Sequence, residues 1–147
     1  MTSDVTSSGL GAVQAPATAS RAVPMWRTGL IACVAAAAAT TAVAALGRSA
    51  GASLEVDGEP IPLLGFPQLT LLFGVIGVLL AVALRRWAPA PRRAFLAATA
   101  VLTALSVVPD LIVPATVPTR LTLIAAHLVA AAIVVPLVAA RLPARTR

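Results

Sequence analysis

Residues Leu121–Ala140 read LTLIAAHLVAAAIVVPLVAA, and His127 is their only ionisable side chain. A helix rises about 1.5 Å per residue, so roughly 20 residues cross a hydrocarbon core of about 30 Å. Three similar apolar runs precede this one, at 29–47, 66–84 and 94–113. The sequence therefore predicts an all-α protein, a four-transmembrane-helix bundle.

Composition also favours a membrane protein. The 147-residue chain is 59% hydrophobic and only 11% charged, whereas about a quarter of the residues of a soluble domain are charged. A chain of this size cannot hide so much apolar surface in its own core. The predicted partner is therefore the lipid bilayer. The net charge of +6 is better explained by membrane topology than by nucleic-acid binding, because the arginines flank the apolar runs.

The basic residues are all arginines, and most of them fall on one side of the predicted spans. Short loops rich in Lys and Arg stay in the cytoplasm, so both termini and the middle loop are predicted to be cytoplasmic in a bacterial plasma membrane. Trp26 and Trp87, at the same span ends, suit the membrane interface. Only Arg48 and Arg120 lie on the outer side. The nine on the cytoplasmic side are Arg21, Arg27, Arg85, Arg86, Arg92, Arg93, Arg141, Arg145 and Arg147.

The chain divides into three predicted parts. Residues 1–24, rich in Ser, Thr, Ala and Gly, are typical of a disordered cytoplasmic tail. Residues 25–142 form the four-helix transmembrane domain, and residues 143–147 form a basic cytoplasmic tail. A signal peptide cleaved near Gly47–Ala50 is an open alternative, although the first apolar run is longer than a usual signal-peptide core.

Small residues predict where helices pack closely. The first span is rich in alanine, which in lipid lets a neighbouring helix approach, so it either packs centrally or is a generic span of a high-GC genome. Gly74 and Gly77 are three residues apart, which is not the GxxxG spacing, and they predict local close packing. In the third span, Pro109 predicts a kink, or a helix end near Val108.

The outer loop between the first two spans contains Asp57-Gly58 between two extended-looking stretches. This pair is a common signature of a tight hairpin turn, so we expect a small outer loop or β-hairpin there. Pro60 restricts the second arm to an edge strand. Glu55, Asp57 and Glu59 favour a solvated acidic surface over a metal site, because metal ligands must converge on one point.

Three ionisable residues could meet in the outer half of the last two spans, namely Asp110, Arg120 and His127. Ionisable groups inside a membrane are costly and are functional candidates by default. A histidine beside a carboxylate could carry protons or hold a ligand. The alternative is structural, with His127 bonded to a carbonyl or a threonine and Asp110 paired with Arg120.

Known catalytic patterns are missing from the sequence. Cys33 has no second cysteine for disulfide exchange, one histidine is too few for most zinc sites, and no glycine-rich phosphate loop is present. We therefore predict no enzyme, no catalytic residues, no cofactor and no metal site.

The arginine-flanked first span, the Val56-Asp-Gly turn, the arginine-rich middle loop and the stretch AHLVAAAIVVP at Ala126–Pro136 occur together. As a set they resemble an uncharacterised family of four-helix integral membrane proteins of actinobacteria, a domain of unknown function, over about residues 26–142. The resemblance implies no activity and no cofactor, and it lends modest support to a role for His127.

The leading functional hypothesis is a non-enzymatic membrane protein, a subunit or stabiliser of a cell-envelope complex, with a membrane-protein partner or a second copy of itself. The alternative is a small transporter or proton-linked carrier using His127 and Asp110, which requires a water-accessible polar cavity reaching His127. Arg85, Arg86, Arg92 and Arg93 are predicted to anchor the inner loop to anionic lipid.

Overall fold

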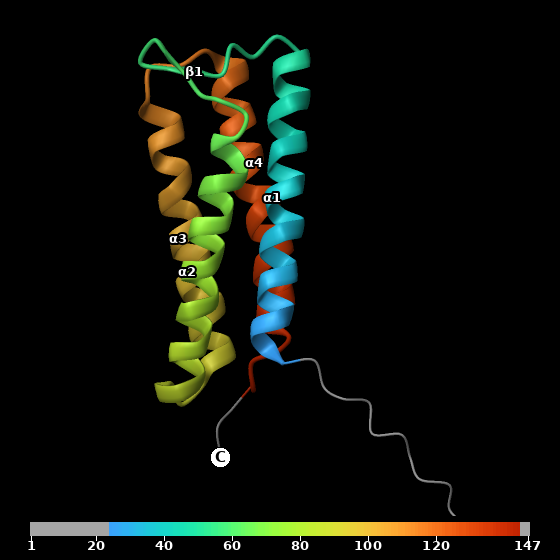
Figure 1. The fold of residues 1–147 in the computed structure, drawn as a ribbon. Helices are drawn as coiled ribbons and strands as arrows, with labels where there is room; N and C mark the ends of the chain where they lie inside the picture. Colours follow the sequence, from blue (N-terminus) through green and yellow to red (C-terminus); the bar gives the residue numbers. More distant parts are fainter. Residues whose placement is uncertain (1–23, 145–147) are drawn as a thin grey trace, which may run out of the picture.

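Four long helices make up most of the computed structural model, which describes residues 24–144 (Figure 1). Each is long and apolar enough to cross a membrane, and the prediction of four packed apolar helices is confirmed. The predicted tails lie outside the described residues, except for residues 24, 143 and 144. The helices are α1 (Met25–Ser49), α2 (Gly65–Trp87), α3 (Pro91–Ile112) and α4 (Val117–Ala139).

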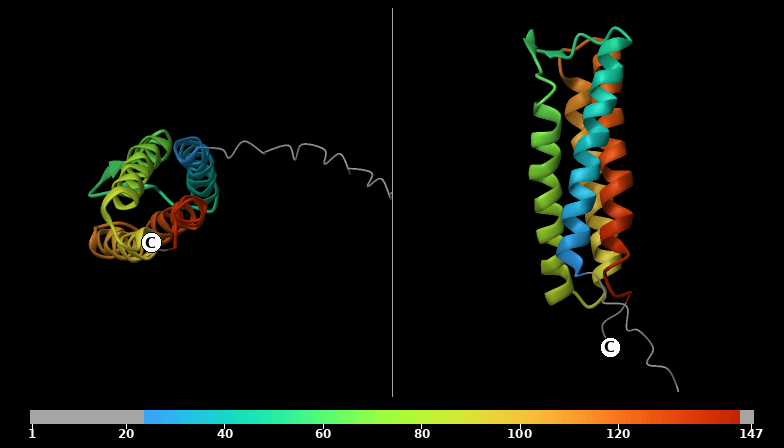
Figure 2. Two further views of the ribbon diagram at one scale, coloured as in Figure 1. Left: turned by 90° about the horizontal axis from the view of Figure 1, so that it is seen from below. Right: turned by 45° about the vertical axis from the view of Figure 1, so that its right-hand side comes forward.

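The helices form a closed ring, in which α1 and α3 each pack against both α2 and α4 (Figure 2). Both ends of the described chain lie at the end of the bundle where α2 turns into α3, and the hairpin lies at the opposite end (Figure 1). We call these the inner end and the outer end. This arrangement is what four alternating spans require.

Helix α1 is the most deeply buried of the four helices, but it is one side of the ring and contacts only α2 and α4 closely. The close approach predicted from its alanines is therefore confirmed, and the predicted central position is wrong. The buried residues of α1 are all small, so the backbones of α2 and α4 come close to it. A Cβ atom added to Gly47 would lie 3.0 Å from Thr122 Cβ of α4, and one added to Gly74 of α2 would lie 3.3 Å from Cys33 Cβ. Gly77 has nothing within 4 Å, so close packing is confirmed at Gly74 and wrong at Gly77.

One of the two outcomes predicted for the third span was a helix end near Val108, and this is wrong. Helix α3 continues through Pro109 to Ile112. Pro109 has no backbone N–H, so it cannot donate to the carbonyl one turn earlier. The last turn still closes, because Val113 N donates to Pro109 O at 2.9 Å. Val113 then becomes extended (ψ 142°), the conformation that the following Pro114 favours.

The connection from α1 to α2 forms an ordered cap over the outer end, which we call the outer cap (residues 50–64). It contains the antiparallel hairpin of β1 (Glu55–Val56) and β2 (Glu59–Pro60). Asp57 (φ 54°) and Gly58 (φ 82°) both have positive φ, as the tightest hairpin turns require. The predicted hairpin is confirmed, and the side chains of its three acidic residues are exposed.

Helix α2 is the least buried of the four. Within it only Phe66 and Ala81 are buried, and large apolar residues such as Phe73 and Leu79 are more than 60% exposed. An apolar surface of this length is not stable in water. Contact with a lipid bilayer follows from it.

Candidate functional site: an ion pair between two spans and a polar layer under the outer cap

Asp110 of α3 and His127 of α4 approach each other closely, with 2.8 Å between Asp110 Oδ2 and His127 Nδ1, a contact that is an ion pair only when the imidazole is protonated. No other acid and base among the described residues lie within salt-bridge distance. Asp110 lies two residues before the end of α3, and His127 lies ten residues into α4. At helical rise the two positions differ in depth by about 12 Å. The connection of residues 113–116 allows for this difference, because α4 starts further out than α3 ends (Figure 1).

The hydrogen bonding of this pair is incomplete. His127 Nδ1 also lies 3.1 Å from Leu123 O on its own helix, and a carbonyl oxygen can only accept, so Nδ1 carries the hydrogen. A single ring hydrogen cannot point well at two oxygens. Asp110 Oδ2 therefore lies close to the ring but accepts no well-aligned hydrogen bond from any described residue.

Burial of the pair is uneven. The Asp110 side chain is 10% exposed, whereas the His127 side chain is 41% exposed. A buried carboxylate without a full set of hydrogen bonds is costly in an apolar medium. The arrangement combines parts of both sequence hypotheses, because His127 bonds to a backbone carbonyl and also contacts a carboxylate.

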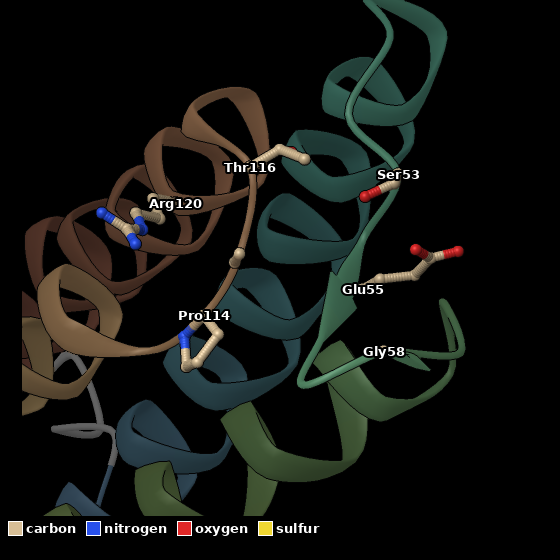
Figure 3. Close-up of a pocket in the computed structure, with 7 residues that line it drawn as sticks. Ser53, Glu55, Gly58, Pro114, Thr116 and Arg120 are labelled. Atoms are coloured by element: carbon tan, nitrogen blue, oxygen red, sulfur yellow. The ribbon is translucent and has the colours of Figure 1, made fainter.

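Arg120 does not join Asp110 and His127. No ion pair links it to another residue of the 24–144 range, and its Nε atom is buried there without a hydrogen-bond partner. It lies instead beside an open cavity of about 380 Å³ at the outer end, between the outer cap and the connection from α3 to α4. Figure 3 shows the Arg120 guanidinium on one side of that connection, with Ser53 and Glu55 on the other side.

Thr119 organises the polar layer beneath the cap and was missed by the sequence analysis. It is fully buried, and its Oγ1 accepts from Leu54 N at 3.2 Å and from Thr116 Oγ1 at 3.0 Å. Ser53 Oγ lies 3.3 Å from the same atom. The only local signal was a threonine three residues before it, at the N-cap of α4, and this spacing does not predict contact with the distant residues 53 and 54.

The cap is also bound through its turn. Asp57 N donates to Pro114 O at 3.1 Å. Leu54 is fully buried, and its backbone has φ 53°, which is unusual for a residue other than glycine. Such a backbone persists only where its surroundings hold it. The hydrogen bonds to Thr119 and Pro114 supply that support, so the outer cap is held against the connection from α3 to α4 and the first turn of α4.

The predicted lipid anchors gather at the inner end. Trp26 and Trp87 are 61% and 77% exposed, and the side chains of the four arginines of the middle loop are exposed as well. This placement suits contact with headgroups, which stays a prediction. The four are Arg85, Arg86, Arg92 and Arg93.

Cys33 is buried, and the part of the chain that the structure describes contains no group of three or more His, Cys, Asp or Glu side chains able to hold a metal ion. An apolar groove between α1 and α2, of about 140 Å³, is lined by residues such as Trp26, Leu30 and Val75. Neither this groove nor the outer cavity is lined by Asp110 or His127.

Comparison with known proteins adds one finding. Neither the search of curated proteins nor the search of solved structures found a match. A family model does match, and it spans residues 20–144, which include all four helices and the outer cap. The chain therefore belongs to the family of unknown function DUF6069.

Proposed function

We propose that this multi-pass membrane protein is a non-enzymatic subunit or stabiliser of a cell-envelope complex, and that its outer cap binds a second membrane protein. The observation that supports the proposal is that tertiary hydrogen bonds hold the outer cap against the start of α4 and the connection before it. A loop that merely joins two helices needs no tertiary hydrogen bonds, whereas this one has them at Leu54 and Asp57. Holding a short acidic hairpin in one orientation lowers the entropy cost of binding a partner.

Photo-crosslinking tests this proposal. We expect benzoylphenylalanine at Glu59, on the exposed hairpin, to give a discrete product of higher mass in irradiated intact cells. The same group at Trp87, exposed at the inner end, is the matched control and should give no discrete protein product. A product of twice the chain mass would show that the partner is a second copy of this chain and not another protein. The absence of any product at Glu59 would contradict a role for the cap in binding.

Thr119→Val tests whether the orientation of the cap matters. The substitution keeps a similar shape but removes the acceptor of Leu54 N, and an unsatisfied buried group costs about 1–3 kcal/mol. We expect hydrogen exchange to accelerate in residues 53–61 and the crosslinking yield at Glu59 to fall severalfold. Thr41→Val, which removes a hydroxyl bonded only to Ala37 O of its own helix, should change neither. An unchanged yield with a loosened cap would show that orientation is irrelevant.

We further propose a plasma-membrane location with the inner end in the cytoplasm, supported by the arginines gathered there. In a Cys33→Ala background, we expect Glu59→Cys to react with a membrane-impermeant maleimide in intact cells. Ala90→Cys, in the turn between α2 and α3, should react only after permeabilisation. The reverse pattern would invert the topology.

A proton-linked carrier is the second candidate. The 2.8 Å contact between Asp110 and His127 favours it, whereas the outer cavity and the groove between α1 and α2, neither of which is lined by these two residues, do not supply the polar cavity that a carrier requires. A carrier should dissipate an imposed pH gradient in proteoliposomes, and His127→Gln should abolish that flux when equal amounts of folded protein are reconstituted. Wild-type protein that leaves the gradient intact would exclude proton movement without an added substrate. The same outcome would leave the subunit proposal standing.

A further inference from the structure

The groove between α1 and α2 carries a further inference, which is independent of the outer cap and its proposed partner. The two helices lie side by side there (Figure 2), and on each helix the lining residues are three or four positions apart, so they share one face. None of these side chains is charged. They are Trp26, Leu30 and Cys33 of α1 and Val75, Val78 and Leu79 of α2.

The groove is open toward the surroundings of the bundle. The helix backbones come close beneath it, because a Cβ atom added to Gly29 would lie only 2.7 Å from Val78 Cγ2. The larger Leu30 and Leu79 line the groove but stay 50% and 61% exposed. In a membrane this surface faces acyl chains, so the groove offers an acyl chain apolar contact along its length.

Two arginines lie at the end of the groove that is nearer the inner end of the bundle. Arg86 comes seven residues after Leu79, so it lies on the same face of α2, about 10 Å nearer the inner end. Arg27 comes three residues before Leu30 and is therefore its neighbour on the surface of α1. Helical side chains tilt toward the N-terminus, which for Arg27 is the inner end. Both arginine side chains are exposed.

Neither Arg27 nor Arg86 has an acidic partner within residues 24–144. A guanidinium group binds a phosphate through two parallel N–H groups, and basic residues between spans at one membrane surface are typical of sites for anionic lipid headgroups. The acids of the described range all lie in the outer cap or near the outer end of α3, and they are Glu55, Asp57, Glu59 and Asp110.

We propose that this groove binds one anionic phospholipid from the leaflet at the inner end, with an acyl chain along the groove and the headgroup phosphate between Arg27 and Arg86. A zwitterionic phospholipid fits the groove equally well, but its cationic group is repelled by the two arginines. A helix of another protein, or of a second copy, would fill the groove without supplying the negative charge that the arginines lack. The charges therefore favour the anionic lipid as the occupant.

Quenching of Trp26 tests the proposal, because bromine atoms on an acyl chain quench an indole that they touch. Trp87→Phe leaves Trp26 as the only tryptophan of the full chain. The protein is reconstituted in phosphatidylcholine bilayers that contain either phosphatidylglycerol or phosphatidylcholine brominated in the acyl chains. We expect an association constant about fivefold higher for the brominated phosphatidylglycerol. Equal constants overturn the proposal. Quenching by neither lipid would show that protein fills the groove, and it overturns the proposal as well.

Charge variants separate a site from general attraction to a basic surface. Arg27→Gln combined with Arg86→Gln should remove the preference for phosphatidylglycerol at Trp26. Arg92→Gln combined with Arg93→Gln is the matched control, since it removes the same charge at the start of α3, away from the groove, and should keep the preference. An equal loss in both double variants would mean that only surface charge attracts the lipid, and it contradicts the proposed site.

A groove-filling variant tests the position of the acyl chain. Val75 lines the groove and is 45% exposed, so Val75→Phe fills space without entering the core. We expect the association constant of the brominated phosphatidylglycerol at Trp26 to fall severalfold. Val101→Phe, at a 58% exposed position of α3, makes the same change elsewhere and should leave the constant as it is. An unchanged constant in Val75→Phe would place the lipid outside the groove.

Discussion

Gly47→Ala is expected to lower the free energy of unfolding of the bundle by about 1–3 kcal/mol, the usual cost of overpacking a filled interface. The added Cβ would lie 2.6 Å from Thr122 Cγ2 and 3.0 Å from Thr122 Cβ. Rotation about the Thr122 side chain moves Cγ2 but leaves Cβ in place. Separation of α1 from α4 would relieve the remaining clash with Cβ, so the loss is shared along the interface between these two helices.

Gly77→Ala is the matched control, since it adds the same methyl group to a helix at a position with nothing within 4 Å. Its unfolding, followed by tryptophan fluorescence as the SDS fraction of mixed micelles rises, should be unchanged or slightly shifted to higher SDS. Thr122→Ala should partly rescue Gly47→Ala, because it removes Oγ1 and Cγ2. Equal behaviour of the two glycine variants would mean that α1 and α4 do not pack as described.

The second large effect is expected at the ion pair between spans. His127→Gln removes the imidazole that lies 2.8 Å from the buried Asp110 side chain, and we expect a loss of about 1–2 kcal/mol in the free energy of unfolding, near the upper end for polar contacts between membrane helices. Asp110→Asn should cost a similar amount. The double variant should lose less than the sum, because the second substitution removes a group whose partner is already gone.

A double-mutant cycle in the same micelle assay measures this coupling, which we expect to be about 1 kcal/mol. The control cycle combines His127→Gln with Glu59→Gln, whose carboxylate is exposed on the hairpin, and its terms should add. Additive losses at Asp110 and His127 would show that their 2.8 Å approach carries no energy.

The cap shows where sequence reasoning succeeds and where it stops. The Asp57-Gly58 turn was predictable, because positive φ at two successive positions selects these residue types locally. The hydrogen bond that holds the cap was not predictable, since Leu54 and Thr119 are 65 residues apart. In the sequence, a threonine at the start of a helix indicates only a capping residue, whatever else it contacts.

The charged cluster divides in the same way. Asp110 and His127 lie inside the last two apolar runs and Arg120 lies directly before the fourth, and these positions identified the three residues as candidates from the sequence. The folded chain brings Asp110 to His127 and leaves Arg120 beside the outer cavity. This division depends on the rotation of α4 about its axis and on the extended connection before it, and neither leaves a periodic signal in the sequence.

Glycine makes the same point, because Gly74 and Gly77 look alike in the sequence but only Gly74 meets a neighbouring helix. Four apolar runs and the distribution of arginines were enough to predict a four-helix membrane protein, since span length and loop charge are set by the bilayer and act on each segment separately. The tertiary structure alone decided which small residues carry the packing, which charges meet and which line a cavity. Those outcomes depend on how the helices are rotated and offset against one another, and many sequence positions contribute to that at once.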